Sequence, residues 1–151
     1  VNVVELMKKN NAIIGGEGNG GIIYPELHYG RDSLVGVALF LTHLANKKMT
    51  VSALRASYPE YYMSKNKIEL TPQIDVDAIL VAMTEKYEND SSTGSLSTID
   101  GVKIDFAKEW VHLRKSNTEP IIRIYTEAPS QKQADALALR IIDEIKAVAG
   151  I

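Results

Sequence analysis

The chain has 151 residues and a mass of 16.6 kDa, the size of one domain or of one small domain plus part of another. Its 45% hydrophobic and 24% charged residues are close to the averages for soluble globular proteins, which argues against disorder, collagen and coiled coils. The net charge of −2 shows no basic excess for binding nucleic acid or an anionic membrane. The absence of cysteine excludes disulfides, thiolate metal sites and thiol catalysis.

No apolar run approaches the ~20 residues that a membrane-spanning helix needs. The sequence begins at Val1 without an initiator methionine and without the apolar stretch of a signal peptide. We therefore expect a cytoplasmic protein, with no membrane or nucleic acid among its partners, and a chain that is a piece of a longer one.

The first elements along the chain are short. A helical pattern covers Val3–Lys9, and the apolar residues Ala12–Ile14 predict a brief strand that runs into a group of glycines. Residues 22–24 look extended, because Pro25 blocks an immediate helix.

Two helices follow. Asp32 and Ser33 are suitable N-cap residues for a helix over residues 34–45, which is apolar on nearly all sides and should be buried on several of them. A shorter helix over residues 50–56 has Thr50 as its cap, and Pro59 ends this part of the chain. This first third looks too small to close a core of its own.

The pattern restarts after Pro59. Residues 61–70 predict a strand, and Asp75 begins a helix with one apolar face. That face consists of Val76, Ile79, Leu80, Met83 and Tyr87. Residues 89–97 are polar and predict a loop. The Asp-Gly pair within residues 99–102 predicts a hairpin, since it can supply the positive-φ positions of a tight primed turn.

Two strands and a helix complete the chain. Trp110–Lys115 and Ile121–Ala128 predict strands, and Ser130 with Gln133 forms a capping box for a helix ending at Gly150. Its predicted core stripe is Ala134, Leu137, Ala138, Ile141, Ile142, Ile145 and Val148. The order β-α-β-β-β-α predicts an α+β domain, an antiparallel sheet with helices on one face.

Residues 15–21 form the most unusual segment, because five of the seven are glycine in a chain with only ten. Their spacing satisfies the dinucleotide pattern G-x-G-x-x-G, but that motif must open a helix at once, and the extended residues after it do not.

The glycines could instead let the backbone approach a ligand closely. Glu17 and Asn19 together offer hydrogen-bond acceptors and donors that suit sugar hydroxyls. A plain tight turn with exposed polar residues explains the same pattern, and the residues alone do not decide between the two.

A second polar segment, residues 114–120, joins two predicted strands. Arg114 supplies a planar fork for phosphate oxygens, and Ser116, Asn117 and Thr118 add hydroxyl and amide donors. These groups predict a phosphate clamp, although an ordinary polar hairpin loop is the alternative, and Glu119 argues mildly against an anion site.

No reaction centre is visible in the sequence. His28 and Arg31 precede a helix N-terminus and could assist an anion, but a single histidine without a partner is more often structural. His43 and His112 are read as packing or surface residues, and no histidines have metal-ligand spacing. No serine lies in a nucleophile elbow.

Taken together, these segments resemble the C-terminal part of an α-D-phosphohexomutase, the family of phosphoglucomutase, phosphomannomutase and phosphoglucosamine mutase. Residues 16–21 resemble the family's sugar-specificity loop, and residues 114–120 resemble its phosphate-binding loop. The flanking residues 25–32 and 121–125 also fit, so the likeness covers essentially the whole chain.

The resemblance implies a four-domain enzyme, an isomerase that acts as an intramolecular phosphotransferase. A phosphoserine in the first domain would exchange a phosphoryl group with the hexose phosphate through a bisphosphate intermediate. Mg²⁺ would be held by a loop of the second domain, outside this chain, and a glucose 1,6-bisphosphate type of activator is compatible with this cycle.

On this resemblance, residues 1–58 are the C-terminal part of the third domain, an α/β domain, and residues 60–151 are the fourth, TATA-binding-protein-like domain. Glu17 and Asn19 would hold sugar hydroxyls. The phosphate that is not transferred would be held by Arg114, Ser116, Asn117 and Thr118.

Two departures from the family pattern matter. Gly21 stands where some members have a histidine, and no segment resembles the phosphoserine motif or the metal loop. The chain alone is therefore expected to be inactive and to depend on the missing N-terminal mutase domains. The alternative is a free-standing phosphosugar-binding module, which the coding sequence upstream of Val1 would distinguish. The sequence does not specify the sugar, and the roles of His28, Arg31 and Arg123 stay open.

Overall fold

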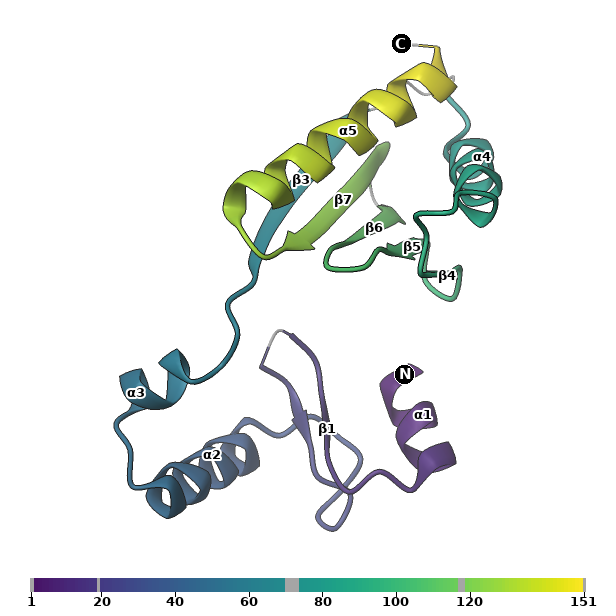
Figure 1. Cartoon of the computed structure of the whole chain (residues 1–151). Coiled ribbons are helices and arrows are strands. Elements are labelled where there is room, and N and C mark those ends of the chain that lie inside the picture. Colours follow the sequence, from purple (N-terminus) through teal and green to yellow (C-terminus); the bar gives the residue numbers. More distant parts are fainter. Residues whose placement is uncertain (1, 19, 70–73, 117–118, 151) are drawn as a thin grey trace. The chain divides into compact units, whose positions relative to one another are not determined.

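The computed structural model describes residues 2–18, 20–69, 74–116 and 119–150 (Figure 1). The chain divides into two compact units, Val1–Pro59 and Glu60–Ile151, which we call unit 1 and unit 2. The longest described helix, with 19 residues, is interrupted by charged side chains, and nowhere in the described ranges does a helix reach the length and apolarity needed to cross a bilayer.

The described residues of unit 1 form three helices and a small antiparallel ribbon. The elements are α1 (Asn2–Asn10), β1 (Gly15–Gly16), β2 (Ile22–Ile23), α2 (Ser33–Lys47) and α3 (Val51–Ala56). β1 pairs with β2, so the extended backbone predicted at Ile22 is confirmed. Asp32 and Thr50 are the N-caps of α2 and α3, as predicted.

The strand predicted at Ala12–Ile14 is wrong, because pairing begins only at Gly15. The backbone N–H of Ala12 still donates to Met7 O at 2.9 Å, so the chain is turning out of α1 at that point. At Gly15 the side chain of buried Met7 occupies the space behind the backbone, and a Cβ there would lie 2.2 Å from Met7 Sδ. Glycine therefore allows the ribbon to form next to α1.

The expectation that α2 is buried on several sides is also wrong. None of its described residues is buried, and Leu34 is 80% exposed. The helix contacts β2 at Gly36, whose missing Cβ would lie 2.9 Å from Ile22 Cγ1. The two-residue strands described in unit 1 offer too small a surface to cover a helix of 15 residues.

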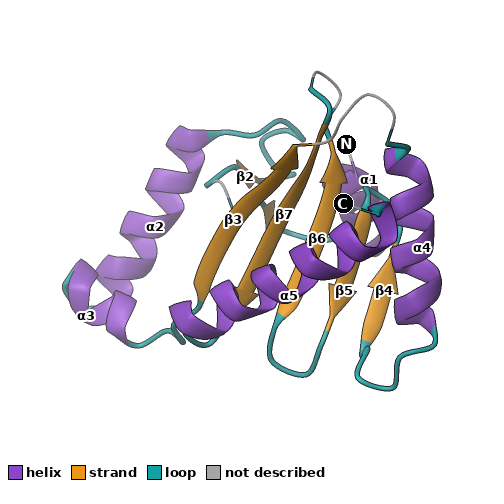
Figure 2. Ribbon diagram, turned by 90° about the horizontal axis from the view of Figure 1, so that it is seen from above, coloured by secondary structure: helices purple, strands orange, loops and turns teal. Residues whose placement is uncertain are grey.

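Unit 2 is a five-stranded antiparallel sheet with two helices on one face (Figure 2). Its elements are β3 (Tyr62–Glu69), α4 (Val76–Glu88), β4 (Ser95–Ser97), β5 (Val102–Asp105), β6 (Trp110–Lys115), β7 (Ile121–Ala128) and α5 (Gln131–Ala149). The strand order is β3-β7-β6-β5-β4. The predicted α+β class is confirmed.

Two local predictions in unit 2 need correction. β4 lies inside the predicted loop 89–97, because a three-residue edge strand with Leu96 as its single apolar residue gives no periodic signal. The hairpin from β4 to β5 is present, but four residues connect the strands, and of these only Gly101 has a positive φ, +75°. The tight primed turn is therefore wrong.

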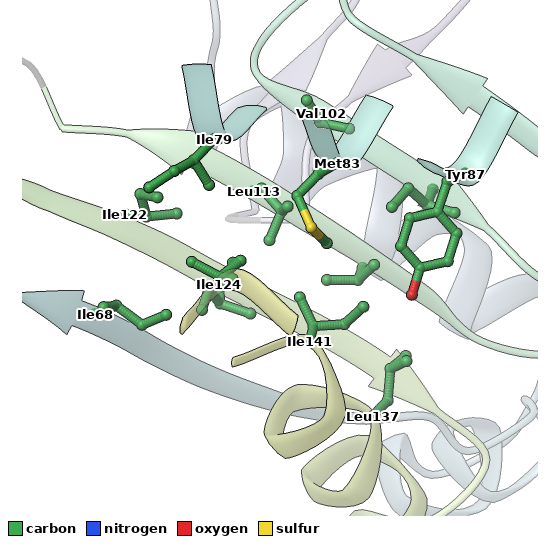
Figure 3. Packing of buried hydrophobic residues seen from close by; sticks show 13 residues of the cluster. Ile68, Ile79, Met83, Tyr87, Val102, Leu113, Ile122, Ile124, Leu137 and Ile141 are labelled. Carbon is green, nitrogen blue, oxygen red and sulfur yellow. The ribbon is translucent and has the colours of Figure 1, made fainter. Parts of the chain in front are cut away.

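The core of unit 2 lies between the sheet and the two helices. Met83 from α4 and Ile141 from α5 are completely buried and point toward sheet residues such as Leu113 and Ile124 (Figure 3). The predicted apolar faces of both helices are confirmed except at Val148, which is 45% exposed. The next residue of the last turn, Ala149, packs against the core instead.

We expect Met83→Ala to lower the free energy of unfolding of unit 2 by about 2–5 kcal/mol, because it leaves a cavity at a fully buried position. Urea unfolding followed by the fluorescence of Trp110, the single tryptophan, measures this effect. Val81→Ala on the same helix is the control, since Val81 is 56% exposed and should change the value by no more than about 0.5 kcal/mol. Equal effects of the two substitutions would contradict the packing described here.

Candidate functional site

The loop between β6 and β7 lies at one end of the sheet of unit 2. Ser116, its first residue, is 9% exposed, and its backbone N–H donates to Ile121 O at 3.1 Å. The N–H of Ile121 in turn donates to Glu119 O at 2.8 Å. Two further residues predicted to bind phosphate, Asn117 and Thr118, lie outside the described residues.

Arg114 stands on the face of the sheet that the helices leave open. Because side chains alternate along a strand, buried Leu113 points into the core and Arg114 points away from it. Its guanidinium Nη2 lies 3.0 Å from Asp100 Oδ2, and 47% of the side chain is exposed. Of the four residues predicted to hold phosphate, the structure thus describes Arg114 and Ser116, and it places them two residues apart at the start of one loop.

Two more cations stand beside Arg114 on the open face. The strand register places Arg123 of β7 opposite Arg114 and Lys67 of β3 opposite Arg123, so the three form one row across three strands. Within the described ranges Arg123 has no carboxylate at ion-pair distance, whereas Lys67 pairs with Glu69 at 2.8 Å. The alternation of polar and apolar residues along each strand predicts that these cations lie on the open face. Only the pairing register of the three strands shows that they lie side by side.

Lys115, the last residue of β6, forms an ion pair with Asp77 of α4. Its Nζ lies 2.6 Å from Asp77 Oδ2 in the first turn of α4. Asp75 caps that helix, accepting the N–H groups of Asp77 and Ala78. Asp75 is therefore the N-cap of α4, and Asp77 ties the loop to the helix.

The glycine-rich loop of unit 1 connects β1 and β2. The N–H of Glu17 donates to Gly21 O and the N–H of Gly20 donates to Glu17 O, both at 3.0 Å, and Gly20 has φ +85°. These bonds fold the loop back on itself, so both its ends lie together. Asn19, the second residue predicted to bind sugar, lies outside the described residues.

Glu17 faces a hollow of about 690 Å³ within unit 1. The lining includes Lys8 and Arg31, and Lys8 Nζ lies 4.8 Å from the centre of the Tyr29 ring. Lys8 belongs to α1. It was not predicted as a site residue, because in the sequence it is one charged residue of an amphipathic helix. Glu5 also lines the hollow, which therefore combines two carboxylates with two cations and an aromatic ring.

His28 has a structural role. Its Nδ1 accepts the N–H of Gly30 at 2.9 Å, so Nε2 is the atom that donates to Asp32 Oδ2 at 3.2 Å. Both ring nitrogens are thereby used in shaping the segment before α2, which favours the structural interpretation of this histidine over the catalytic one.

Asp32 links this segment to the helix. Its carboxylate accepts the N–H groups of Leu34 and Val35. The hydrogen bond from Val35 and then that from His28 hold the pKa of Asp32 below its ordinary value, although partial desolvation opposes them.

Residues that could hold a metal ion are not grouped anywhere in the described parts of the chain. No three histidine, aspartate or glutamate side chains come together there in a suitable cluster. The chemistry that the described residues offer is hydrogen bonding and charge pairing to anions and hydroxyls.

Sequence profiles of known protein families match both parts of the chain. The sequence profile of "Phosphoglucomutase/phosphomannomutase, C-terminal domain" matches residues 66–144, and that of "Phosphoglucomutase/phosphomannomutase, alpha/beta/alpha domain III" matches residues 1–62. The chain belongs to the phosphoglucomutase/phosphomannomutase family. The resemblance to phosphohexomutases read from the two loops is confirmed.

Named relatives from archaea show which mutases the chain resembles. The chain is 38% identical over 148 residues to a phosphoglucosamine/phosphogalactosamine mutase of Sulfurisphaera tokodaii. It is 36% identical over 145 residues to a phosphoglucomutase/phosphomannomutase of Thermococcus kodakarensis. These alignments cover 98% and 94% of this chain but 31% of each relative, so the chain spans about a third of the length of the mutases it matches.

Solved structures of the family share the fold. A phosphoglucomutase/phosphomannomutase family protein from Burkholderia thailandensis superposes with a TM-score of 0.68 and 23% sequence identity. The superposition covers 97% of this chain and 30% of that protein. An N-acetylphosphoglucosamine mutase of Aspergillus fumigatus, in complex with glucose 1,6-bisphosphate, gives a TM-score of 0.50 with 20% identity, covering 81% and 22%.

The lowered pKa of Asp32 has a consequence for unit 1. Stabilisation by the charged carboxylate is complete above the unfolded-state pKa of about 3.9, and it is lost as the pH falls through the lower pKa of the folded state. We expect the carboxyl ¹³C resonance of Asp32 to titrate with a midpoint below that ordinary value. Asp32→Asn keeps a capping oxygen and should remove this pH dependence. A midpoint at or above the ordinary value would contradict the capping geometry.

Proposed function

We propose that this chain is the substrate-holding part of a phosphohexomutase that interconverts hexose 1-phosphate and hexose 6-phosphate. The loop between β6 and β7 grips the phosphate that is not being transferred, and the loop between β1 and β2 holds sugar hydroxyls. One observation carries the proposal: Arg114 lies on the open face of the sheet, two residues before Ser116 at the start of the β6–β7 loop.

The phosphate grip combines charge with directed donors. Arg114 presents a planar set of N–H groups that matches phosphate oxygens, and the neighbouring Arg123 adds a cation without a carboxylate partner among the described residues. Ser116, Asn117 and Thr118 supply further donors. Such positioning is much of what phosphoryl transfer requires of a protein.

The sugar contact uses the hollow of unit 1. Glu17 accepts hydrogen bonds from hydroxyls, and Asn19, two positions later in the sequence, supplies an amide. Lys8 and Arg31 on the same hollow donate to hydroxyl oxygens, which gives the site both hydrogen-bonding polarities. Gly21 offers no side chain to this contact.

The transfer step itself depends on groups beyond the described residues. Family resemblance implies a phosphoserine that exchanges its phosphoryl group with the sugar through a bisphosphate, and Mg²⁺ would supply charge neutralisation at that serine. Glucose 1,6-bisphosphate, the ligand of the Aspergillus mutase, is a compound of this kind. This chain's residues bind and orient the sugar phosphate while transfer takes place elsewhere.

We expect Arg114→Ala to weaken the binding of glucose 6-phosphate by about 10- to 100-fold, because it removes a charge-assisted hydrogen-bonding group. Calorimetric titration of the whole chain measures the change. Arg140→Ala is the matched control: Arg140 lies on α5 above the ring of Phe106, so the substitution removes the same charge away from the loop. Equal affinities of the wild type and Arg114→Ala would refute the phosphate grip.

We expect the 151-residue chain to bind hexose phosphate without turning it over, because no segment resembles the phosphoserine motif or the metal loop. A coupled assay with glucose 1-phosphate, Mg²⁺ and glucose 1,6-bisphosphate tests this, with the Thermococcus relative as positive control. Product formation above the rate of the protein-free reaction would overturn the expectation.

A further inference from the structure

We propose that Asp100 is a positioning residue for phosphate binding: its carboxylate holds the guanidinium of Arg114 in the orientation that grips the phosphate. This inference rests on the proposed function of Arg114. Asp100 lies in the four-residue connection between β4 and β5, and its Oδ2 is 3.0 Å from Arg114 Nη2.

The backbone of this connection is fixed to β6 on both sides of Leu113. His112 Nε2 lies 2.5 Å from Asp100 O, within hydrogen-bond distance. At Gly101 the backbone comes so close to the strand that a Cβ would lie 2.1 Å from Leu113 O and 3.3 Å from Arg114 Cα. The backbone that carries the Asp100 carboxylate is therefore held close to Arg114.

An anchored guanidinium is better prepared for phosphate than a free one. The arginine side chain has many rotamers, and the freedom lost when it binds a ligand opposes affinity. Asp100 takes up one edge of the planar group, at Nη2, and leaves other N–H groups for phosphate oxygens. Lys115 cannot replace Arg114 as the phosphate-binding cation, because its ammonium group is paired with Asp77.

The carboxylate of Asp100 also repels a phosphate dianion, so its charge and its hydrogen-bond acceptance act in opposite directions. Two substitutions separate these effects. Asp100→Asn and Asp100→Ala remove the same charge, but asparagine retains an amide oxygen that accepts a hydrogen bond from Arg114.

We expect Asp100→Ala to bind glucose 6-phosphate about three- to tenfold more weakly than Asp100→Asn, as for the loss of one hydrogen bond. The full chain is titrated calorimetrically in both forms. Both substitutions should be tolerated, because Asp100 does not have a positive φ. Amide NMR spectra confirm that both variants are folded.

The same comparison of Asp100→Asn with Asp100→Ala, repeated in a chain that also carries Arg114→Ala, tests whether Arg114 is the side chain that Asp100 positions. In that background the asparagine and alanine variants should bind equally, because there is no guanidinium to orient. If the two variants bind alike while Arg114 is present, or still differ after its removal, the positioning role is refuted although the phosphate grip stands. If Arg114→Ala alone leaves the affinity unchanged, the grip is refuted and the positioning role falls with it.

Discussion

The alternation of side chains across a sheet covered on one face is the constraint on which the candidate phosphate site depends. Leu113 is completely buried beneath α4 and α5, and this forces its neighbour Arg114 onto the open face. A shift of the β6 register by one residue would bury the arginine and expose the leucine. The apolar core of unit 2 therefore determines which residues can meet a ligand.

The same end of the sheet brings together segments that are distant in the sequence. The β4–β5 connection contributes Asp100, the first turn of α4 contributes Asp77, and the end of β6 contributes two cations that pair with them. Both ion pairs are partly exposed, so they add little to the stability of the fold. We infer that their effect is on orientation, since each pairs a flexible basic side chain beside the β6–β7 loop with a carboxylate.

Local features, the fold class and the core-facing sides of the unit 2 helices were predictable from the sequence, whereas contacts that depend on strand register were not. The caps Asp32, Thr50 and Ser130 and both strands around the phosphate loop are where the pattern predicts them, because capping and alternation are encoded by neighbouring residues. The exposure of α2 and the Arg114–Asp100 pair depend on surfaces and registers that no short window contains. The binding roles of all six candidate site residues stay predictions: Glu17, Asn19, Arg114, Ser116, Asn117 and Thr118.

A crystal structure of the chain with glucose 6-phosphate tests the central claim most directly. The account predicts the phosphate bound at the β6–β7 loop, with an Arg114 nitrogen and Ser116 Oγ within about 3.2 Å of its oxygens and the Arg114–Asp100 pair retained. A phosphate bound at any other place on the chain, with Arg114 turned away from it, would contradict the account.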